Sequence, residues 1–262
     1  YDIKNAIKQV DLAEKLIKPL KGKEEEDYYM NLLYMKGTYL GAEGKVEEQQ
    51  SYYLKIIPVL EKANSYKVLS NVYIALGTLY FNQSESKNAE KYFLKTLDVL
   101  KKMDAPSRNF SVAYLKLALL KVEDGDIEAT ENYLEKARPD VENKSVSLVA
   151  QSNYYNYLGK IQRHRKQYKE ALNSFEKSLT LAREYGNVHA IANNLREIGK
   201  IYSDQSMYQK ARPYLVEYYN VTKDLDDHSM TLGPLKGPSD GASTLRPRRS
   251  RRRRGSCTIA PC

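Results

Sequence analysis

The sequence contains no tryptophan and only two cysteines, Cys257 and Cys262, which both lie at its C-terminal end. The rest of the chain therefore uses neither disulfides nor a thiolate metal site. Sparse cysteine also fits a reducing compartment, and we predict a cytoplasmic protein. No run of about 18 apolar residues occurs, so no transmembrane helix is expected.

Motifs for catalysis are missing as well. The three histidines, His164, His189 and His228, have no cysteine or carboxylate neighbours at metal-ligand spacing. The chain has no glycine-rich phosphate loop and no GxSxG motif. We therefore predict a protein that is not an enzyme and that binds neither a cofactor nor a metal.

Charge is nearly balanced over most of the chain. Residues 1–227 contain 34 basic and 32 acidic side chains, whereas residues 228–262 contain eight basic side chains and one acidic. The formal net charge of +9 therefore belongs mainly to the C-terminal segment.

Aromatic residues are mostly tyrosine, with 23 Tyr against 4 Phe. A tyrosine ring can pack against a core while its hydroxyl reaches water, so tyrosine suits half-buried positions. Many half-buried positions favour an elongated molecule with a large surface relative to its core.

Small residues recur with a period of about 40 residues, which is the range of helical repeats. They occur at Gly37, Gly77, Ala118, Gly159 and Gly199. A second series follows eleven or twelve residues later, at Gln49, Ala89, Ala129, Ala171 and Ala211. A large side chain comes four residues after each member of that series, at Tyr53, Phe93, Tyr133, Phe175 and Leu215. In this alignment the third repeat has a turn one residue shorter than the others.

The columns predict helical hairpins. Residues three and four apart share one face of a helix, so Tyr73, Leu76 and Gly77 form a single stripe. Where two helices cross closely, a glycine or alanine at the contact lets the axes approach while large neighbours interdigitate. Pro58 and Pro213 fall within predicted second helices, whereas Pro139 is expected to end one.

The stretches "YIALGTLY" (73–80) and "AEKYF" (89–93) resemble the tetratricopeptide repeat, with its W-x2-L-G-x2-Y and A-x3-F signatures. The long period is similar to that of kinesin-light-chain-like and bacterial regulator proteins. The resemblance implies an all-α fold, an α-solenoid of antiparallel helix hairpins in a right-handed superhelix. Repeats are predicted at about 28–66, 67–106, 107–144, 145–187 and 188–226, after a leftover second helix at 1–20. Residues 1–227 then form the solenoid and residues 228–262 a disordered tail.

The same resemblance implies that fixed positions of each first helix line a concave groove. The second position carries Asn31, Asn71, Val112, Asn153 and Asn193. An asparagine amide both donates and accepts, which suits the backbone of an extended peptide. The other positions are mostly apolar at Tyr34, Thr38, Ile74, Phe81, Leu115, Leu119 and Val122. They are mostly basic or polar at Asn156, Lys160, Arg163, His164, Arg196 and Lys200.

We therefore expect a non-enzymatic scaffold that binds a protein or peptide segment. The hydrophobic side chains of that segment would lie at one end of the groove and its acidic groups at the other, so that charge reversal at Arg163 plus Arg196 would weaken binding. The alternative interpretation is that these side chains are ordinary solvated charges and amides.

The arginine-rich segment leaves further alternatives open. It contains Arg246, Arg248, Arg249, Arg251, Arg252, Arg253 and Arg254, which could bind nucleic acid by neutralising phosphates. The abrupt change from lysine to arginine also fits a changed reading frame or foreign sequence. In that case residues 1–227 could be the ligand-sensing part of a bacterial transcriptional or two-component regulator.

Overall fold

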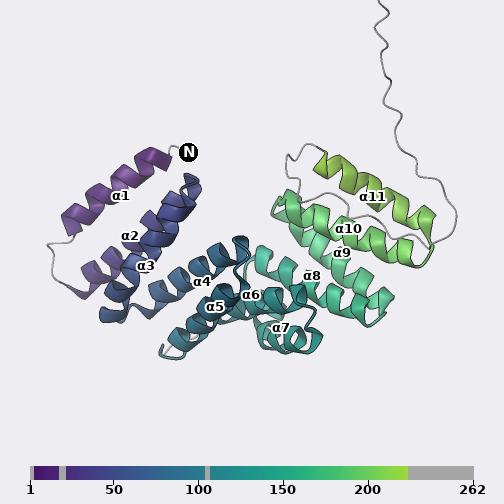
Figure 1. Cartoon of the computed structure of the whole chain (residues 1–262), viewed down its shortest axis with the longest axis horizontal. Helices are drawn as coiled ribbons and strands as arrows, with labels where there is room; N and C mark the ends of the chain where they lie inside the picture. Colours follow the sequence, from purple (N-terminus) through teal and green to yellow (C-terminus); the bar gives the residue numbers. More distant parts are fainter. Residues whose placement is uncertain (1–2, 18–21, 104–106, 224–262) are drawn as a thin grey trace, which may run out of the picture. The chain divides into compact units, whose positions relative to one another are not determined.

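The structure is a computed structural model, which describes residues 3–17, 22–103 and 107–223. In these ranges it contains helices and no strand (Figure 1). The helices are α1 (Ile3–Ile17), α2 (Lys23–Ala42), α3 (Val46–Lys62), α4 (Tyr66–Asn82), α5 (Ser86–Leu100), α6 (Asn109–Glu123), α7 (Ile127–Glu142), α8 (Leu148–His164), α9 (Tyr168–Glu184), α10 (Val188–Asp204) and α11 (Tyr208–Thr222). None of them is both long and apolar enough to cross a membrane.

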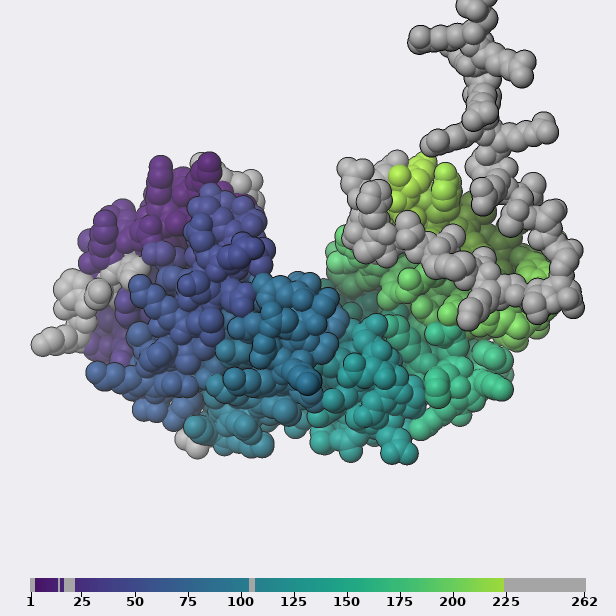
Figure 2. All heavy atoms as spheres, in the orientation of Figure 1, coloured from purple at the N-terminus to yellow at the C-terminus, as the bar shows by residue number. Residues whose placement is uncertain are grey.

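The predicted all-α solenoid is confirmed. Helices pack as successive hairpins, most extensively α4 with α5, α6 with α7, α8 with α9 and α10 with α11. First helices of adjacent repeats also touch, as α4 does with α6 and α6 with α8. Successive hairpins also contact one another, through α3 with α4, α5 with α6, α7 with α8 and α9 with α10 (Figure 2). The first hairpin begins at Lys23, earlier than the predicted start of its repeat at residue 28.

Most junctions between helices consist of three residues, the second of which has a positive φ. In the turn between α4 and α5, Ser84 has a φ of 63°, and the N–H of Glu85 donates to the carbonyl of Tyr80 at 2.9 Å. This closes the helix as a glycine-type C-terminal motif would. Only some of the turns use glycine there, such as Gly125 and Gly186. Ser84 and Lys166 take the same conformation at a cost of about 1–2 kcal/mol each.

The expected close crossings are confirmed at the small-residue columns. A Cβ added to Gly77 would lie 2.4 Å from Cε1 of Phe93, on the other helix of the same hairpin. Gly159 faces Phe175 in the same manner. Ala89 and Phe93 are both fully buried. In these hairpins the glycine of the first helix therefore makes room for the large side chain of the second helix.

The alignment of the third repeat was wrong. Ala129 and Tyr133 are only half-buried, whereas Thr130 and Leu134 are buried at the positions that Ala89 and Phe93 occupy in the second repeat. The turn after α6 has the same length as the turns after α4 and α8. Thr130 is tolerated there because its hydroxyl donates to the carbonyl of Asp126 at 2.6 Å.

The prolines behave differently from one another. Pro58 and Pro213 lie inside α3 and α11, as the sequence predicts. Pro139 does not end its helix, because α7 continues to Glu142. Proline lacks an N–H but keeps its carbonyl, and the carbonyl of Pro139 accepts from the N–H of Asn143 at 3.1 Å.

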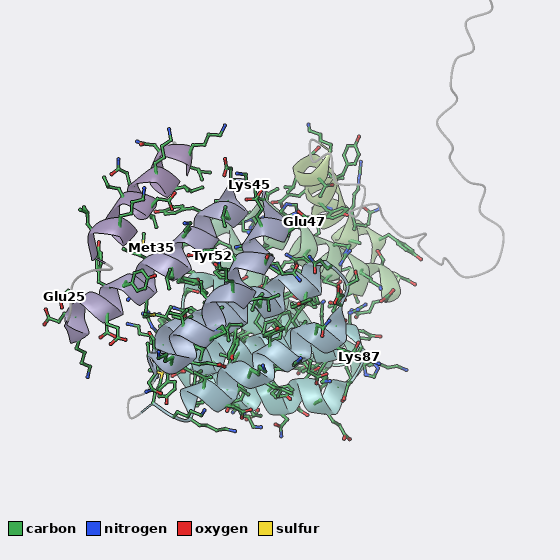
Figure 3. All side chains as sticks on the ribbon, turned by 60° about the vertical axis from the view of Figure 1, so that its left-hand side comes forward. Glu25, Met35, Lys45, Glu47, Tyr52 and Lys87 are labelled. Atoms are coloured by element: carbon green, nitrogen blue, oxygen red, sulfur yellow. The ribbon has the colours of Figure 1, made fainter. Side chains whose placement is uncertain are left out.

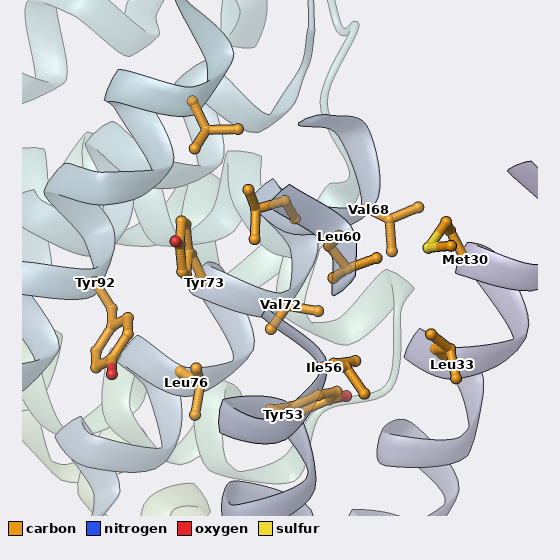
Figure 4. Packing of buried hydrophobic residues seen from close by; sticks show 12 residues of the cluster. Met30, Leu33, Tyr53, Ile56, Leu60, Val68, Val72, Tyr73, Leu76 and Tyr92 are labelled. Atoms are coloured by element: carbon orange, nitrogen blue, oxygen red, sulfur yellow. The ribbon is translucent and has the colours of Figure 1, made fainter. Parts of the chain in front are cut away.

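The core consists of clusters of buried residues, each of which joins helices of adjacent hairpins. Its first cluster joins Met30 and Leu33 of α2 to Ile56 and Leu60 of α3 and to Val72 of α4 (Figure 4). Because every first helix packs both on its own partner and on the preceding hairpin, each repeat depends on its neighbours for burial.

Many of the tyrosines lie beside a lysine. Nζ of Lys95 is 5.5 Å from the ring centroid of Tyr73 and 5.6 Å from that of Tyr92. One period later the arrangement recurs with Lys136, Tyr114 and Tyr133. Each exposed contact of this kind contributes about 0.5–1 kcal/mol. The tyrosine surplus thus has a structural use at the half-buried positions between helices.

Candidate functional site

A hollow of about 140 Å³ lies where α6, α8 and α10 meet. We call it the asparagine cavity. It is lined by Leu119 and Glu123 of α6, Ser152, Asn153, Asn156, Tyr157 and Lys160 of α8, Ser178 of α9, and Ala190, Asn193 and Asn194 of α10. Among the predicted groove residues, it therefore brings together Leu119, Asn153, Asn156, Lys160 and Asn193.

The other two asparagines of the series lie elsewhere. Asn31 lines a separate, wider hollow of about 470 Å³ beside the starts of α2 and α4. It is exposed, and its amide donates to the carbonyl of Asp27 at 2.7 Å. Asn71 accepts from the amide of Asn109 at 2.7 Å, which joins α4 to α6. The asparagines at equivalent positions thus do not all face one site.

Two of the cavity asparagines have a fixed orientation. Asn194 donates to the carbonyl of Ala190 at 2.8 Å, so its own Oδ1 accepts from Nδ2 of Asn156 at 2.9 Å. Oδ1 of Asn193 accepts from Arg196 at 2.7 Å. A carbonyl can only accept and a guanidinium can only donate, so the amides of Asn194 and Asn193 cannot be reversed. Asn156 is buried, with 6% of its surface exposed, rather than open along the groove.

The basic side chains of the groove are largely paired. Nζ of Lys160 lies 2.8 Å from Oε1 of Glu123. Nε of Arg163 lies 3.3 Å from Oε2 of Glu197, a carboxylate that is only 5% exposed as a residue. Arg196 approaches the same carboxylate at 3.4 Å. Reversing the charge at Arg163 and Arg196 would therefore break an internal ion pair as well as any contact to a ligand.

Lys200 differs from these cations. It is exposed on α10 and forms no ion pair with any residue in the described ranges. Four positive charges lie in this cluster, on Lys160, Arg163, Arg196 and Lys200. The two negative charges of Glu123 and Glu197 offset part of them, which leaves a net charge of about +2. Its positive field is weaker than the sequence suggested.

The predicted apolar residues partly serve the core. The ring of Tyr34 stacks on Tyr53 with a centroid separation of 6.0 Å. Ile74 and Phe81 are half-buried, and Phe81 packs against the cluster around Phe93. Leu115 is 4% exposed and offers almost no surface to a ligand.

Sequence reasoning missed several polar residues of this region, among them Tyr157, Glu197 and Glu123. Tyr157 and Glu197 each follow an asparagine of the series by four residues, as Glu123 follows Leu119. This spacing places each on the same helical face as its predecessor, so the signal was present. At the position of α6 equivalent to Tyr157 stands Lys116, whose pKa is lowered by burial. The equivalent residue of α2, Met35, is 39% exposed (labelled in Figure 3).

Tyr157 is 7% exposed, and its hydroxyl forms no hydrogen bond with any part of the chain that the structure describes. Burial is the main cause that raises its pKa, and the negative charge of Glu123 raises it further. The hydroxyl therefore stays protonated at neutral pH and can donate. No group of three or more histidine, cysteine or carboxylate side chains that could hold a metal occurs within the described ranges.

Comparisons with known proteins agree with this fold. The model of the tetratricopeptide repeat family matches residues 150–224. These residues, helices α8 to α11 almost entirely, thus contain tetratricopeptide repeats, and the remaining hairpins share their architecture. No curated protein sequence matches the chain.

Solved structures extend the likeness over nearly the whole chain. BtubC (BKLC) from P. vanneervenii is 15% identical with a TM-score of 0.62, covering 95% of this chain and all of its own. The apo form of RapI is 15% identical with a TM-score of 0.58, and the match covers 87% of this chain and 61% of the RapI chain. Another match is a putative kinesin light chain from Podosopora anserina with nearly identical TPR-like repeats. It is 13% identical with a TM-score of 0.54, and the match covers 75% of this chain and 95% of that chain. At these identities the likeness concerns the fold, which is that of a tetratricopeptide-repeat solenoid.

Proposed function

We propose that this chain is a non-enzymatic scaffold that binds an extended segment of another protein along its first helices, across α6, α8 and α10. The observation that carries the proposal is the set of unpaired amide groups around the asparagine cavity. Asn153 forms no hydrogen bond with any described residue, and Nδ2 of Asn193 is likewise left over. Such groups on a half-buried surface are available for hydrogen bonds, and the backbone of a peptide can supply both donors and acceptors.

Charge gives the bound segment a direction. Arg196 and Lys200 lie on α10, beyond the cavity, and together with their neighbours they keep a positive field. At the other end of the series, Tyr34, Ile74 and Phe81 are apolar. A segment with hydrophobic side chains toward α2 and α4 and acidic side chains toward α10 complements both ends.

The proposal is tested by selecting peptides from a random displayed library with the full-length protein. The selected peptides are then measured against the variant Asn153→Ala/Asn193→Ala. Two lost hydrogen bonds, at about 0.5–1.5 kcal/mol each, should weaken binding roughly fivefold or more. The control is Asn132→Ala, an exposed asparagine on the second helix α7. If no peptide is selected, or if both variants bind as the parent does, this site is not a peptide groove.

The direction of the peptide has its own test. Lys200→Glu should weaken the binding of peptides with acidic ends, and the binding of these peptides to the parent should weaken at high salt, since exposed charges act over about 8–10 Å. Lys210→Glu on α11 is the matched control, because it makes the same charge change on an exposed second helix. Equal effects of the two variants would mean that only net charge matters.

Two other functions stay as predictions. A role as the sensing part of a bacterial regulator would use the same groove and would require an effector domain joined to the solenoid. Nucleic-acid binding would depend on Arg246 to Arg254, which lie outside the described residues. Salt-dependent DNA binding that is lost when residues 228–262 are removed would favour that alternative.

A further inference from the structure

We propose that the asparagine cavity is a side-chain subsite for a carboxamide, so that the bound segment places a glutamine or asparagine there. This inference rests on the proposed peptide binding and names what one position of the peptide must be. It starts from Tyr157, a residue that is 7% exposed and lines the cavity, and whose hydroxyl forms no hydrogen bond within the described part of the chain.

Two of the asparagines that line the cavity keep a polar atom without a hydrogen bond in the described part of the chain, one an acceptor and one a donor. The bonds from Asn156 to Asn194 and from Asn194 to Ala190 leave Oδ1 of Asn156 unused. The bond from Arg196 leaves Nδ2 of Asn193 unused. A carboxamide presents an NH₂ donor and a C=O acceptor on one planar group, which complements this pair.

Other side chains fit the cavity less well. A carboxylate can only accept, so it would meet Oδ1 of Asn156 and the nearby Glu123 without a proton to share. The one cation that lines the cavity, Lys160, is already held by Glu123 at 2.8 Å. An ammonium can only donate, so it would be opposed by the other donors of the cavity, Nδ2 of Asn193 and Nζ of Lys160. An apolar side chain would leave Tyr157 and both asparagines without partners, which is costly for buried groups.

The size of the cavity also suits such a group. About 140 Å³ corresponds to roughly four or five water molecules, at about 30 Å³ each. The end of a glutamine side chain fits within this volume. The main chain of the peptide would then lie outside, along the first helices.

The first experiment uses four peptide pools that differ only at a fixed central residue, which is Gln, Glu, Lys or Met. Selection with the full-length protein should favour the Gln pool over the Met pool by roughly tenfold, because Met has a similar shape but leaves the polar groups unpaired. Peptides selected equally from all four pools, or best from the Glu pool, would overturn the subsite while leaving the peptide groove in place.

The second experiment uses a variant that removes only one hydroxyl. Tyr157→Phe should weaken the binding of the selected Gln peptides by about three- to tenfold and should not weaken the binding of Met peptides. Tyr154→Phe is the matched control, because Tyr154 is similarly buried on α8 but does not line the cavity. Equal losses for Gln and Met peptides would indicate a merely structural role for Tyr157 and would contradict the proposal.

A third measurement does not depend on peptide binding. Propionamide, propionate and propylammonium are titrated into isotope-labelled full-length protein while the side-chain amide signals of Asn153, Asn156 and Asn193 are followed by NMR. Only propionamide should shift them in a saturable way. If it does and no pool is selected, the subsite stands and the peptide function fails. If the three probes act alike, or none shifts these signals, the subsite is refuted.

Discussion

Replacement of Gly77 by alanine tests the crossing of the helices most directly. In an open helix this change would stabilise the protein by about 1 kcal/mol, because alanine has the higher helix propensity. Here the new Cβ would lie 2.4 Å from Cε1 and 2.6 Å from Cδ1 of Phe93. Phe93 is fully buried among Ala89, Ala113 and Leu117, so its ring has little room to move.

The magnitude is the balance of two opposing effects. Overpacking of this kind costs about 1–3 kcal/mol, so Gly77→Ala should lower the free energy of unfolding by about 1 kcal/mol net. Gly159→Ala is a milder version of the same change. The new Cβ would lie 2.9 Å from the closest atoms of Phe175, so the ring of Phe175 has to move much less than that of Phe93. Its net effect should be near zero or slightly stabilising.

Guanidinium unfolding followed by far-UV circular dichroism measures both variants against the parent, with the slope m checked for constancy. The double variant Gly77→Ala/Phe93→Leu should recover about 1 kcal/mol relative to the sum of its single changes, since removal of the ring removes the clash. Gly77→Ala that stabilises as much as Gly159→Ala, or a double variant that is simply additive, would refute the packing argument.

Contacts outside the glycine column lead to three further predictions. Glu197→Ala should destabilise the protein by about 2 kcal/mol or more in chemical unfolding, because it leaves the buried Nε of Arg163 without its carboxylate. Glu123→Ala, which breaks the more exposed pair with Lys160, should cost under about 1 kcal/mol. Equal costs for the two variants would contradict the burial argument. Ala129→Leu should be tolerated and Thr130→Leu should cost about 1–3 kcal/mol, and the reverse order would restore the alignment that the sequence suggested. The free energy of unfolding should fall as pH rises above about 10, because burial raises the pKa of tyrosines such as Tyr157 and the unfolded chain therefore loses those protons first. Denaturant midpoints measured between about pH 8 and 11 test this direction. A midpoint that rises over that range would contradict the prediction.

The fold was largely predictable because its signal is local. Gly77 and Phe93 lie in neighbouring helices joined by three residues, so their spacing in the sequence almost fixes their spacing in space. The same regularity appears in the turns between paired helices, which lie at residues 83–85, 124–126 and 165–167. It failed at Ala129, because a threonine with its hydroxyl bonded to the preceding turn can replace the expected alanine.

The candidate site was only partly predictable. The repeat positions place Asn153 and Asn193 in one helical register, and both line the asparagine cavity. They could not show that Asn31 would line a different hollow, or that Asn156 would be buried against Asn194. Those outcomes depend on how closely one hairpin approaches the next.

By itself the sequence determined the pairing of helices into hairpins and the face that each hairpin buries, because those properties depend on residues a few positions apart. Only the tertiary structure decided which polar groups remain available to a partner. The pairs that consume them, Lys160 with Glu123 and Asn156 with Asn194, are separated by 37 and 38 residues. Such side chains meet only after adjacent repeats have stacked, so their mutual satisfaction is a property of the assembled solenoid.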